Sequence, residues 1–420
     1  MQLFCYTTDF NCTAYSSMYA LGIDFGTTGV RASLIDIQQL EHWSAHIDWP
    51  QAAQEAQHWR AALMDLMQQV PETYRQQIDY VAVDGTSGTV LLTGADLQPV
   101  TPIMGYNHAL SHDPAQKLSW LKQHDARHHA RYLMHQTDYC NSLLLGKPGA
   151  SDYHSALKSG FNPHTLQWNA DLYTAKDRDL LPEVVAPGSL LGPLRSDWAR
   201  QWGYSAGCEI HAGTTDSIAA FIAAAPDYLP GTAVTSLGST LVIKLLSSTP
   251  VFSAEHGVYS HRFGNLWLTG GASNTGGAVL RHYFNDTELE QLSAQIQPEQ
   301  PSQFDYYPLL HAGERFPVND PQLAPRLTPR PADSVSWLHG LLEGMAAIEQ
   351  QGYARLIALG ATPPSRILSS GGGSRNLAWQ AIRQRRLGIP VARARHGEAA
   401  YGSALLAMGL NIGAKYGQIL

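Results

Sequence analysis

One stretch near the N-terminus, Leu21 to Asp36, constrains the fold of this chain more than any other; it reads LGIDFGTTGVRASLID. An apolar run ends in a single carboxylate, Asp24. A Gly-Thr-Thr-Gly turn over residues 26–29 follows, and a second run extends from Val30 to Ile35. Two such runs joined by a glycine-rich turn are typical of a β-hairpin with a polar tip.

The composition of this turn indicates what the hairpin could bind. Glycines let backbone N–H groups approach an anion closely, and threonine hydroxyls add donors. The carboxylate of Asp24 would repel a bare phosphate, but a divalent cation between them would remove that repulsion. The stretch therefore predicts a clamp for Mg²⁺ and nucleotide phosphates, with an ordinary hairpin and tight turn as the alternative.

Composition bounds the class of protein. A chain of 420 residues is too long for one core, which predicts two domains. The net charge of −7 does not favour a nucleic-acid or anionic-membrane partner, and no apolar run reaches a membrane-spanning length. Four cysteines without CxxC spacing argue against a zinc site and fit a reducing, cytoplasmic setting. Residues 1–18 lack the features of a secretory signal and are expected to form a disordered leader.

Two further carboxylates follow predicted strands. The run Tyr80 to Asp84 reads as a buried strand that leads into a Gly-Thr-Ser-Gly loop. Asp216 follows a Gly-Thr-Thr loop and opens an alanine-rich helix, where the helix dipole favours a negative charge. A simple N-cap is the alternative for Asp216.

The second half of the chain repeats the organisation of the first. After a linker over Pro226 to Gly231, a second strand–turn–strand has its turn at Gly238-Ser239-Thr240, as an internal duplication would produce. Gly-rich loops over residues 270–277 and 371–373 each precede a helix. With no Walker A, GxGxxG or GxSxG pattern, we interpret the chain as paired hairpins that hold phosphates and a Gly-rich turn that holds an adenosine.

Six segments now occur together and in order: DFGTTGVRA, DGTSGT, AGTTDSIAAF, TSLGST, TGGASNTGG and SSGGGSRNLAWQ. This set resembles the phosphate, substrate and adenosine motifs of the FGGY carbohydrate kinases, a branch of the actin-like ATP-binding superfamily, over roughly residues 19 to 412. The segments DGTSGTVLL, SDYHSALKSG and AGTTDSIAAF are most similar to the short D-ribulose kinase branch.

The resemblance implies an α/β fold of two RNase H-like (actin-like ATPase) domains around a central cleft, hinged near residues 226–231. The N-terminal domain would cover residues 19–228 and the C-terminal domain residues 229–400, with a final helix at about 400–415 packed back on the first. It also implies ATP and Mg²⁺ as cofactors and a small-molecule sugar as substrate.

The resemblance further implies roles for individual residues. Asp216 would be the catalytic base, and Asp24 would hold Mg²⁺ through water. Asp24, Asp84, Ser87 and Asp216 would face the sugar. The residues implied to bind ATP are Gly26, Thr27, Thr28, Gly29, Val30, Arg31, Gly238, Ser239, Thr240, Gly276, Gly372, Gly373 and Asn376. From the residues alone, a solvent-exposed position on a strand is the other interpretation of Arg31.

The expected reaction is ATP-dependent phosphorylation of D-ribulose to D-ribulose 5-phosphate. A xylulose or polyol kinase and a non-transferring actin-like ATPase switch are the alternatives, and the oligomeric state stays open. Many family members carry Trp-x-Asp-x-Arg where residues 105–109 read GYNHA, so sugar contacts there cannot be transferred. We also expect Arg383, Arg385 and Arg386 to form a solvated helix face, and the histidines of residues 105–135 to lie on a surface rather than bind a metal.

Overall fold

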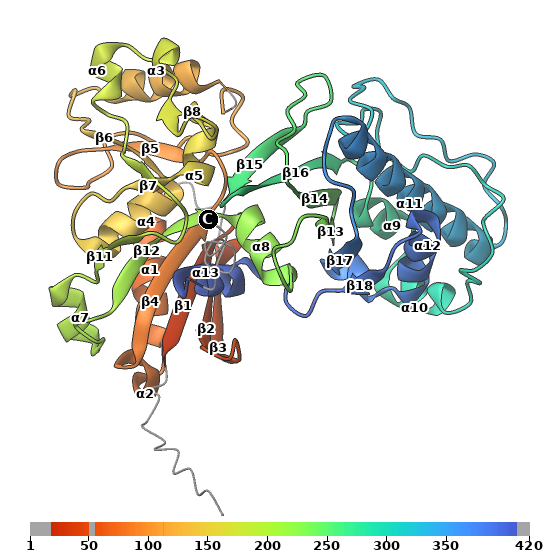
Figure 1. The fold of residues 1–420 in the computed structure, drawn as a ribbon, viewed down its shortest axis with the longest axis horizontal. Coiled ribbons are helices and arrows are strands. Elements are labelled where there is room, and N and C mark those ends of the chain that lie inside the picture. Colours follow the sequence, from red (N-terminus) through yellow and green to blue (C-terminus); the bar gives the residue numbers. More distant parts are fainter. Residues whose placement is uncertain (1–17, 50–54, 112, 410–420) are drawn as a thin grey trace, which may run out of the picture.

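The computed structural model describes residues 18–49, 55–111 and 113–409. The predicted leader, up to residue 17, lies outside these ranges. The described chain forms two α/β lobes, each built on a six-stranded sheet, with two helices between them (Figure 1).

The first lobe is organised around the predicted hairpin. Strands β1 (Tyr19–Phe25) and β2 (Gly29–Asp36) pair antiparallel, and β3 (Glu41–Asp48) pairs with β2. Strand β4 (Ile78–Gly85) lies parallel to β1, and β12 (Glu209–Thr215) lies parallel to β4. The sheet order is β11-β12-β4-β1-β2-β3, with β11 spanning Leu190–Pro193.

The second lobe repeats this pattern of pairing. Its hairpin is β13 (Thr232–Leu237) and β14 (Leu241–Ser247), its third strand is β16 (Leu266–Ser273), and its parallel strands are β17 (Arg366–Ser370) and β18 (Val391–Arg393). The sheet order is β15-β16-β14-β13-β17-β18, with β15 spanning Tyr259–Phe263. The predicted fold of two related α/β domains is thereby confirmed.

Helices cover the outer faces of both sheets (Figure 1). Helix α1 (Ala56–Gln69) buries Trp59, Leu63 and Leu66, the side that its helical spacing predicts. Helix α11 (Ser334–Ala358) buries an apolar stripe in the second lobe. The other elements are α2 (Glu72–Arg75), β5 (Val90–Thr93), α3 (Pro114–His124), β6 (Tyr132–His135), α4 (Gln136–Leu145), β7 (Ser151–Asp152), α5 (Tyr153–Leu157), β8 (Phe161–Asn162), β9 (Gln167–Trp168), η1 (Ala170–Leu172), α6 (Ala175–Arg178), β10 (Val184–Val185), α7 (Ser196–Trp202), α9 (Gly277–Tyr283), α10 (Asp286–Ser293), η2 (Gly372–Arg375) and α12 (Leu377–Leu387).

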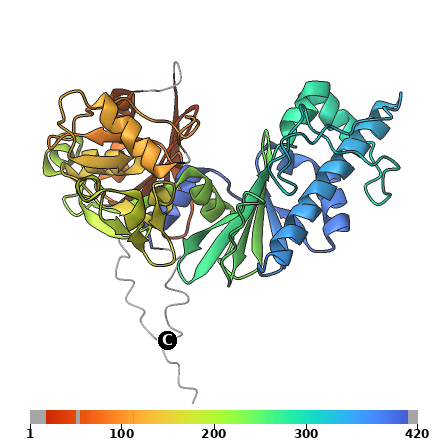
Figure 2. The ribbon, with the colours of Figure 1, turned by 90° about the horizontal axis from the view of Figure 1, so that it is seen from above.

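Helices α8 (Asp216–Ala224) and α13 (Ala399–Ala407) lie between the lobes (Figures 1 and 2). Their apolar side chains form one core with residues of both sheets. Close backbone approach holds α13 in place: a Cβ at Gly22 would lie 1.9 Å from the Ala400 carbonyl oxygen, and one at Gly402 would lie 1.9 Å from that of Ala219. We keep residues 19–228 and 229–400 as the proposed domains, with α13 packed on the first.

The solvated face predicted for three arginines of α12 is wrong. Arg383 is fully buried, and its guanidinium donates to both carboxylate oxygens of Glu349, at 2.6 and 2.7 Å. Arg385 and Arg386 both pair with the buried carboxylate of Glu343. Their partners belong to α11, so the α12 sequence by itself could not reveal them.

The histidines of residues 105–135 differ in how far they are exposed to solvent. His124 is exposed on α3, as expected, whereas His135 is 1% exposed and hydrogen-bonded on both ring nitrogens. His112 lies outside the described residues. Within the described ranges, no group of three or more His, Cys, Asp or Glu is placed to hold a metal ion. No helix in the same ranges has the length and apolarity to cross a membrane.

Candidate active site

Three carboxylates gather at one edge of the first sheet. Strands β1, β4 and β12 are parallel, so their carboxyl ends meet at that edge, where α/β proteins bind ligands. Asp24 is the register partner of Asp84, and Asp84 is the register partner of Thr214. Asp216 begins α8 directly after β12. Neighbouring strands lie about 4.8 Å apart, so the structure brings the three predicted carboxylates together.

Asp84 and Asp24 form a buried pair. Ser403 Oγ on α13 donates to Asp84 Oδ2 at 2.5 Å. Burial, and then the charge of Asp24, raise the pKa of Asp84 well above its usual range, which favours its neutral form. Burial raises the pKa of Asp24 as well, while Arg31, with Nη1 3.4 Å from Asp24 Oδ2, opposes that shift.

Several polar atoms of this pair and its surroundings have no described partner outside the pair. Ser87 Oγ is buried without a hydrogen bond to any described residue, and Asp24 Oδ1 and Asp84 Oδ1 have none besides the hydrogen bond that the two carboxyl groups share with each other. An unpaired buried polar atom is costly. A ligand with hydroxyl groups, or a hydrated cation, would supply the missing partners.

Asp216 stands beside this pair and remains partly exposed. Burial, followed by the charge of Asp24, raises the pKa of Asp216 to about 6. Its Oδ1 accepts a hydrogen bond from Ser217 N at 2.6 Å. Asp216 is therefore a carboxylate whose pKa lies close to neutral, as a general base requires.

Two lysines that the sequence analysis did not single out face Asp216. Lys244 reaches from β14 of the second lobe and donates to the Ser217 carbonyl oxygen. Lys158 Nζ lies 3.4 Å from the Ser87 carbonyl oxygen. Both charges lower the pKa of Asp216, and burial lowers the pKa of Lys244 to about 7. The sequence feature that could have identified Lys244 is a lysine inside the otherwise apolar strand LVIKLL.

The loop that carries Ser87 is held by contacts with α4 and α3. Thr86 donates from both N and Oγ1 to Gln136 Oε1, at 2.8 Å in each case. The ammonium of Lys117 lies 3.5 Å from the Gly88 carbonyl oxygen and donates to that of Lys158 at 2.9 Å. These contacts hold the loop beside Asp84.

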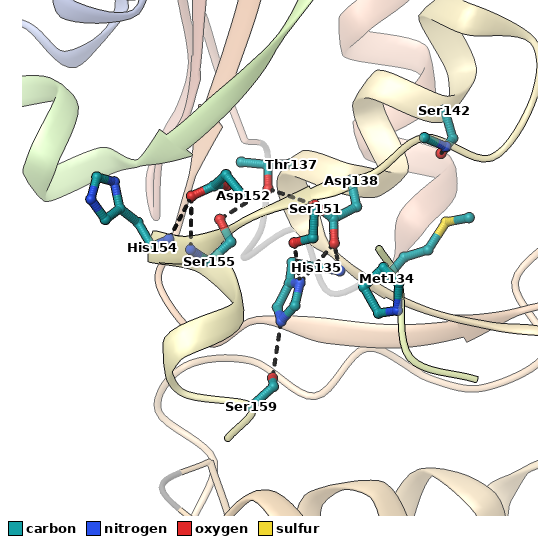
Figure 3. Close-up of polar contacts among 12 residues, drawn as sticks. Met134, His135, Thr137, Asp138, Ser142, Ser151, Asp152, His154, Ser155 and Ser159 are labelled. Atoms are coloured by element: carbon teal, nitrogen blue, oxygen red, sulfur yellow. Dashed lines mark hydrogen bonds and ion pairs between the residues drawn. The ribbon is translucent and has the colours of Figure 1, made fainter. Parts of the chain in front are cut away.

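A buried polar network supports α5 next to the site (Figure 3). His135 contacts Asp138 and Ser151 through Nδ1 and Ser159 through Nε2. His154, on α5, forms two hydrogen bonds. Its Nδ1 lies 2.7 Å from Thr214 Oγ1, and its Nε2 lies 2.6 Å from the carbonyl oxygen of Arg262 in the second lobe. Burial lowers the pKa of His154 to about 3, so it stays neutral and links the lobes by hydrogen bonds.

The first predicted phosphate loop closes tightly over residues 26–29. Gly26 N donates to the Gly29 carbonyl oxygen at 3.0 Å, which leaves Thr27 and Thr28 exposed at the tip. A Cβ at Gly29 would lie 2.4 Å from the Ile47 carbonyl oxygen, so the turn needs glycine there. Val30 is fully buried, so only its backbone could contact a nucleotide. Arg31 is partly exposed on β2, and its guanidinium also contacts Asp24.

The second loop is joined to the two other glycine-rich segments. Gly277 N and Ala278 N donate to the carbonyl oxygens of Gly238 and Ser239, at 2.9 and 3.0 Å, and Arg281 donates to Ser239 Oγ. A Cβ at Gly276 would lie 2.7 Å from the backbone of Thr240. The structure thus places Gly276 directly against the turn of residues 238–240.

The Gly triplet of residues 371–373 packs against the start of this turn, where Gly371 lies close to the backbone of Leu237 and Gly238. A Cβ at Gly373 would come within 2.9 Å of Leu237, whereas one at Gly372 would meet nothing within 4 Å. Asn376 caps α12: its Oδ1 accepts from Trp379 N and its Nδ2 donates to Ser293 Oγ. The predicted ATP residues of the second lobe therefore adjoin one another.

Comparison with known proteins agrees with this geometry. Residues 233–409 match the C-terminal domain, and residues 96–223 the N-terminal domain, of the FGGY family of carbohydrate kinases. The L-fuculokinase of Salmonella typhi is 24% identical over 318 residues, which cover 67% of this chain and 61% of that protein. The chain thus matches under two thirds of that relative's length.

Solved structures share the fold. A xylulose kinase from Brucella ovis superposes with a TM-score of 0.80 at 23% identity, over 93% of this chain and 90% of that one. The glycerol kinase of Plasmodium falciparum with ADP gives a TM-score of 0.80 at 14% identity, over 93% and 89%. At these identities the likeness establishes the architecture of two lobes.

Proposed function

This chain belongs to the FGGY family of carbohydrate kinases, and on that premise we propose that it transfers the γ-phosphate of ATP to a hydroxyl group of a ketopentose, D-ribulose in particular. The observation that carries the proposal is the position of Asp216. Its partly exposed carboxylate, with a pKa raised to about 6, stands beside the buried pair of Asp24 and Asp84.

Asp216 is the proposed general base. A sugar hydroxyl is a poor nucleophile, and a positioned carboxylate can accept its proton as the oxygen attacks phosphorus. The neutral form of Asp84 can donate its proton to Asp24, with which it shares a hydrogen bond, and Ser87 Oγ is free to bond a sugar oxygen. The ammonium groups of Lys158 and Lys244 lie where they can offset negative charge beside Asp216.

Asp24 and the two hairpin turns are proposed to hold the nucleotide phosphates and Mg²⁺. Asp24 Oδ1, which has no described partner outside the carboxyl pair, fits a metal-bound water, and the exposed tip at residues 27–28 fits a phosphate. Mg²⁺, when bound, would neutralise charge on the phosphate oxygens. Gly238, Ser239 and Thr240 form the corresponding turn of the second lobe.

Gly372 and Gly373 are proposed to receive the adenosine. The space beside Gly372 is open, which suits close contact with a ligand. Both polar ends of the Asn376 side chain are engaged within the protein, so we propose that Asn376 shapes this loop.

The proposed sugar rests on the segments DGTSGTVLL and SDYHSALKSG. The first supplies Asp84 and Ser87, and the second supplies Lys158 and His154. A xylulose kinase is the second candidate, because proteins with that name share the architecture.

The test measures ADP release with D-ribulose, D-xylulose and glycerol, for the wild type and Asp216→Asn. The variant keeps the size of the side chain but removes the base, so turnover should fall about 10²- to 10⁴-fold while ATP binding is retained. Asp171→Asn, at an exposed position outside the site, is the matched control.

Near wild-type turnover of Asp216→Asn would remove Asp216 from the proposed role. ADP release that no sugar stimulates would favour an ATPase switch over a kinase. Stimulation by D-xylulose rather than D-ribulose would select the second candidate.

A further inference from the structure

A cavity of about 880 Å³ lies where the chain crosses between the lobes. The chain crosses once at residues 225–231, after α8, and again at residues 394–398, between β18 and α13 (Figure 1). Both crossings line the cavity, together with the turn between β2 and β3. A molecule bound there would touch every covalent connection between the described parts of the two lobes.

This hinge cavity is separate from the carboxylates. Asp24 lies near one end of β1, whereas the turn that lines the cavity follows Asp36, the partner of Tyr19 at the other end. Five residues of extended strand span roughly 17 Å. Along α8, Asp216 and the cavity-lining Ala223 are seven residues apart, or about 10 Å.

The hinge cavity carries unneutralised positive charge. Arg393 and Arg395 line it and are exposed, and their guanidinium groups have no hydrogen bond or ion pair with any described residue. The imidazole of His396 stacks flat on Tyr401, with ring centroids 3.8 Å apart.

Two acidic groups near the cavity already have partners, and Glu398, an exposed residue on the second crossing, does not line the cavity. Asp227, at the rim, is paired with Arg366 and accepts from Thr232 Oγ1 at 3.1 Å. Glu41, whose charge acts on His396, accepts from Ser33 Oγ at 2.6 Å. The two arginines therefore remain available for an anion from solution.

The rest of the lining indicates the size and chemistry of that anion. Gln38 and Gln39 present amides, while Leu368 and Leu405 present apolar surface. Paired guanidinium groups match the oxygens of a phosphate. We propose that this hinge cavity binds a small organic phosphate, such as a phosphorylated sugar, with Arg393 and Arg395 on the phosphate group.

Such a ligand would act on the hinge. Domain closure changes backbone angles in the few residues that connect the moving parts, and here those residues line the cavity. A ligand that contacts both crossings therefore restricts their motion. It would also influence α8, which holds Asp216 at its opposite end.

Hydrogen–deuterium exchange of the full chain tests the proposal, with D-ribose 5-phosphate as the probe and D-ribose as its uncharged counterpart. We expect D-ribose 5-phosphate, but not D-ribose, to slow exchange at residues 222–230 and 391–398. The loops at residues 26–29 and 238–240 report separately on binding at the active site. Hydrogen–deuterium exchange does not require phosphate transfer, so its result is independent of the proposed kinase activity.

The double variant Arg393→Ala/Arg395→Ala should lose this protection, with an affinity for the probe at the hinge at least about tenfold weaker. Arg355→Ala, at an exposed arginine of the same lobe without a described partner, should retain it. Arg393→Lys/Arg395→Lys should retain part of it. The proposal is overturned if the probe protects only the active-site loops, or if the double alanine variant is protected as strongly as the wild type.

Discussion

The charges of Asp216 and Lys244 act on each other across the two lobes. Asp216 begins α8 of the first lobe, and Lys244 extends from β14 of the second to the adjacent Ser217 carbonyl oxygen. Each charge favours the charged form of the other, against the burial that opposes both. Their pKa values of about 6 and about 7 leave a narrow range in which the carboxylate is ionised and the ammonium still protonated.

This pair predicts a bell-shaped dependence of kcat/KM for the sugar on pH, because kcat/KM reports the pKa values of the enzyme without bound sugar. Below pH of about 6, Asp216 gains a proton and cannot act as a base; above pH of about 7, Lys244 loses its proton and its charge. Lys244→Met should remove the basic limb and move the acidic limb upward, because the loss of a neighbouring positive charge raises the pKa of a carboxyl group.

The measurement is kcat/KM for the sugar against pH at saturating ATP. Lys176→Met, an exposed lysine with no described partner, should leave both limbs in place. A basic limb that persists unchanged in Lys244→Met would show that Lys244 does not set it.

At the scale of elements, the sequence predicted what local pattern determines. Both hairpins, the carboxylate near the end of β4 and the one that follows β12 were predicted from short runs, because periodicity and glycine content determine the structure of such runs. Arg383 could not be predicted in this way, because its burial depends on Glu349, thirty-four positions away on another helix. Lys244 was missed because the group it contacts, the Ser217 carbonyl oxygen, belongs to α8 of the other lobe.

Gly402 shows the same dependence on a neighbouring element. An alanine in a helix is favoured over glycine by about 1 kcal/mol, so helix propensity alone predicts that Gly402→Ala stabilises α13. The new Cβ, however, would lie 1.9 Å from the Ala219 carbonyl oxygen of α8. Because backbone atoms cannot yield as a flexible side chain can, we expect a net loss of about 1–3 kcal/mol or more in the free energy of unfolding.

Urea unfolding followed by circular dichroism measures that loss. Gly207→Ala is the control, since a Cβ there meets only Ser205 Oγ, at an ordinary 3.5 Å. A Gly402→Ala protein as stable as the wild type would mean that α8 and α13 can separate without cost.

Considered as a whole, the two lobes share a core. Residues of α8 and α13 pack with Ala20 and Ile35 of the first sheet and with Val234 and Leu246 of the second. The last described helix belongs by sequence to the end of the chain, yet it packs on β1 and donates from Ser403 to Asp84. The shared core between the lobes is therefore complete only when both sheets and both helices are in place. The first lobe also depends on α13, which follows the second lobe in the sequence, for the hydrogen bond to Asp84.

This shared core predicts that the lobes lose stability together. Phe221 on α8 is 1% exposed and packs edge to face on Phe263 of β15, with ring centroids 5.8 Å apart. Truncation of a buried phenylalanine costs about 3–5 kcal/mol. In Phe221→Ala, native-state hydrogen exchange should show an equal fall in protection for β1 and β13. Leu190→Ala, at an exposed edge position, should change neither, whereas a fall in one sheet alone would show that the lobes unfold independently.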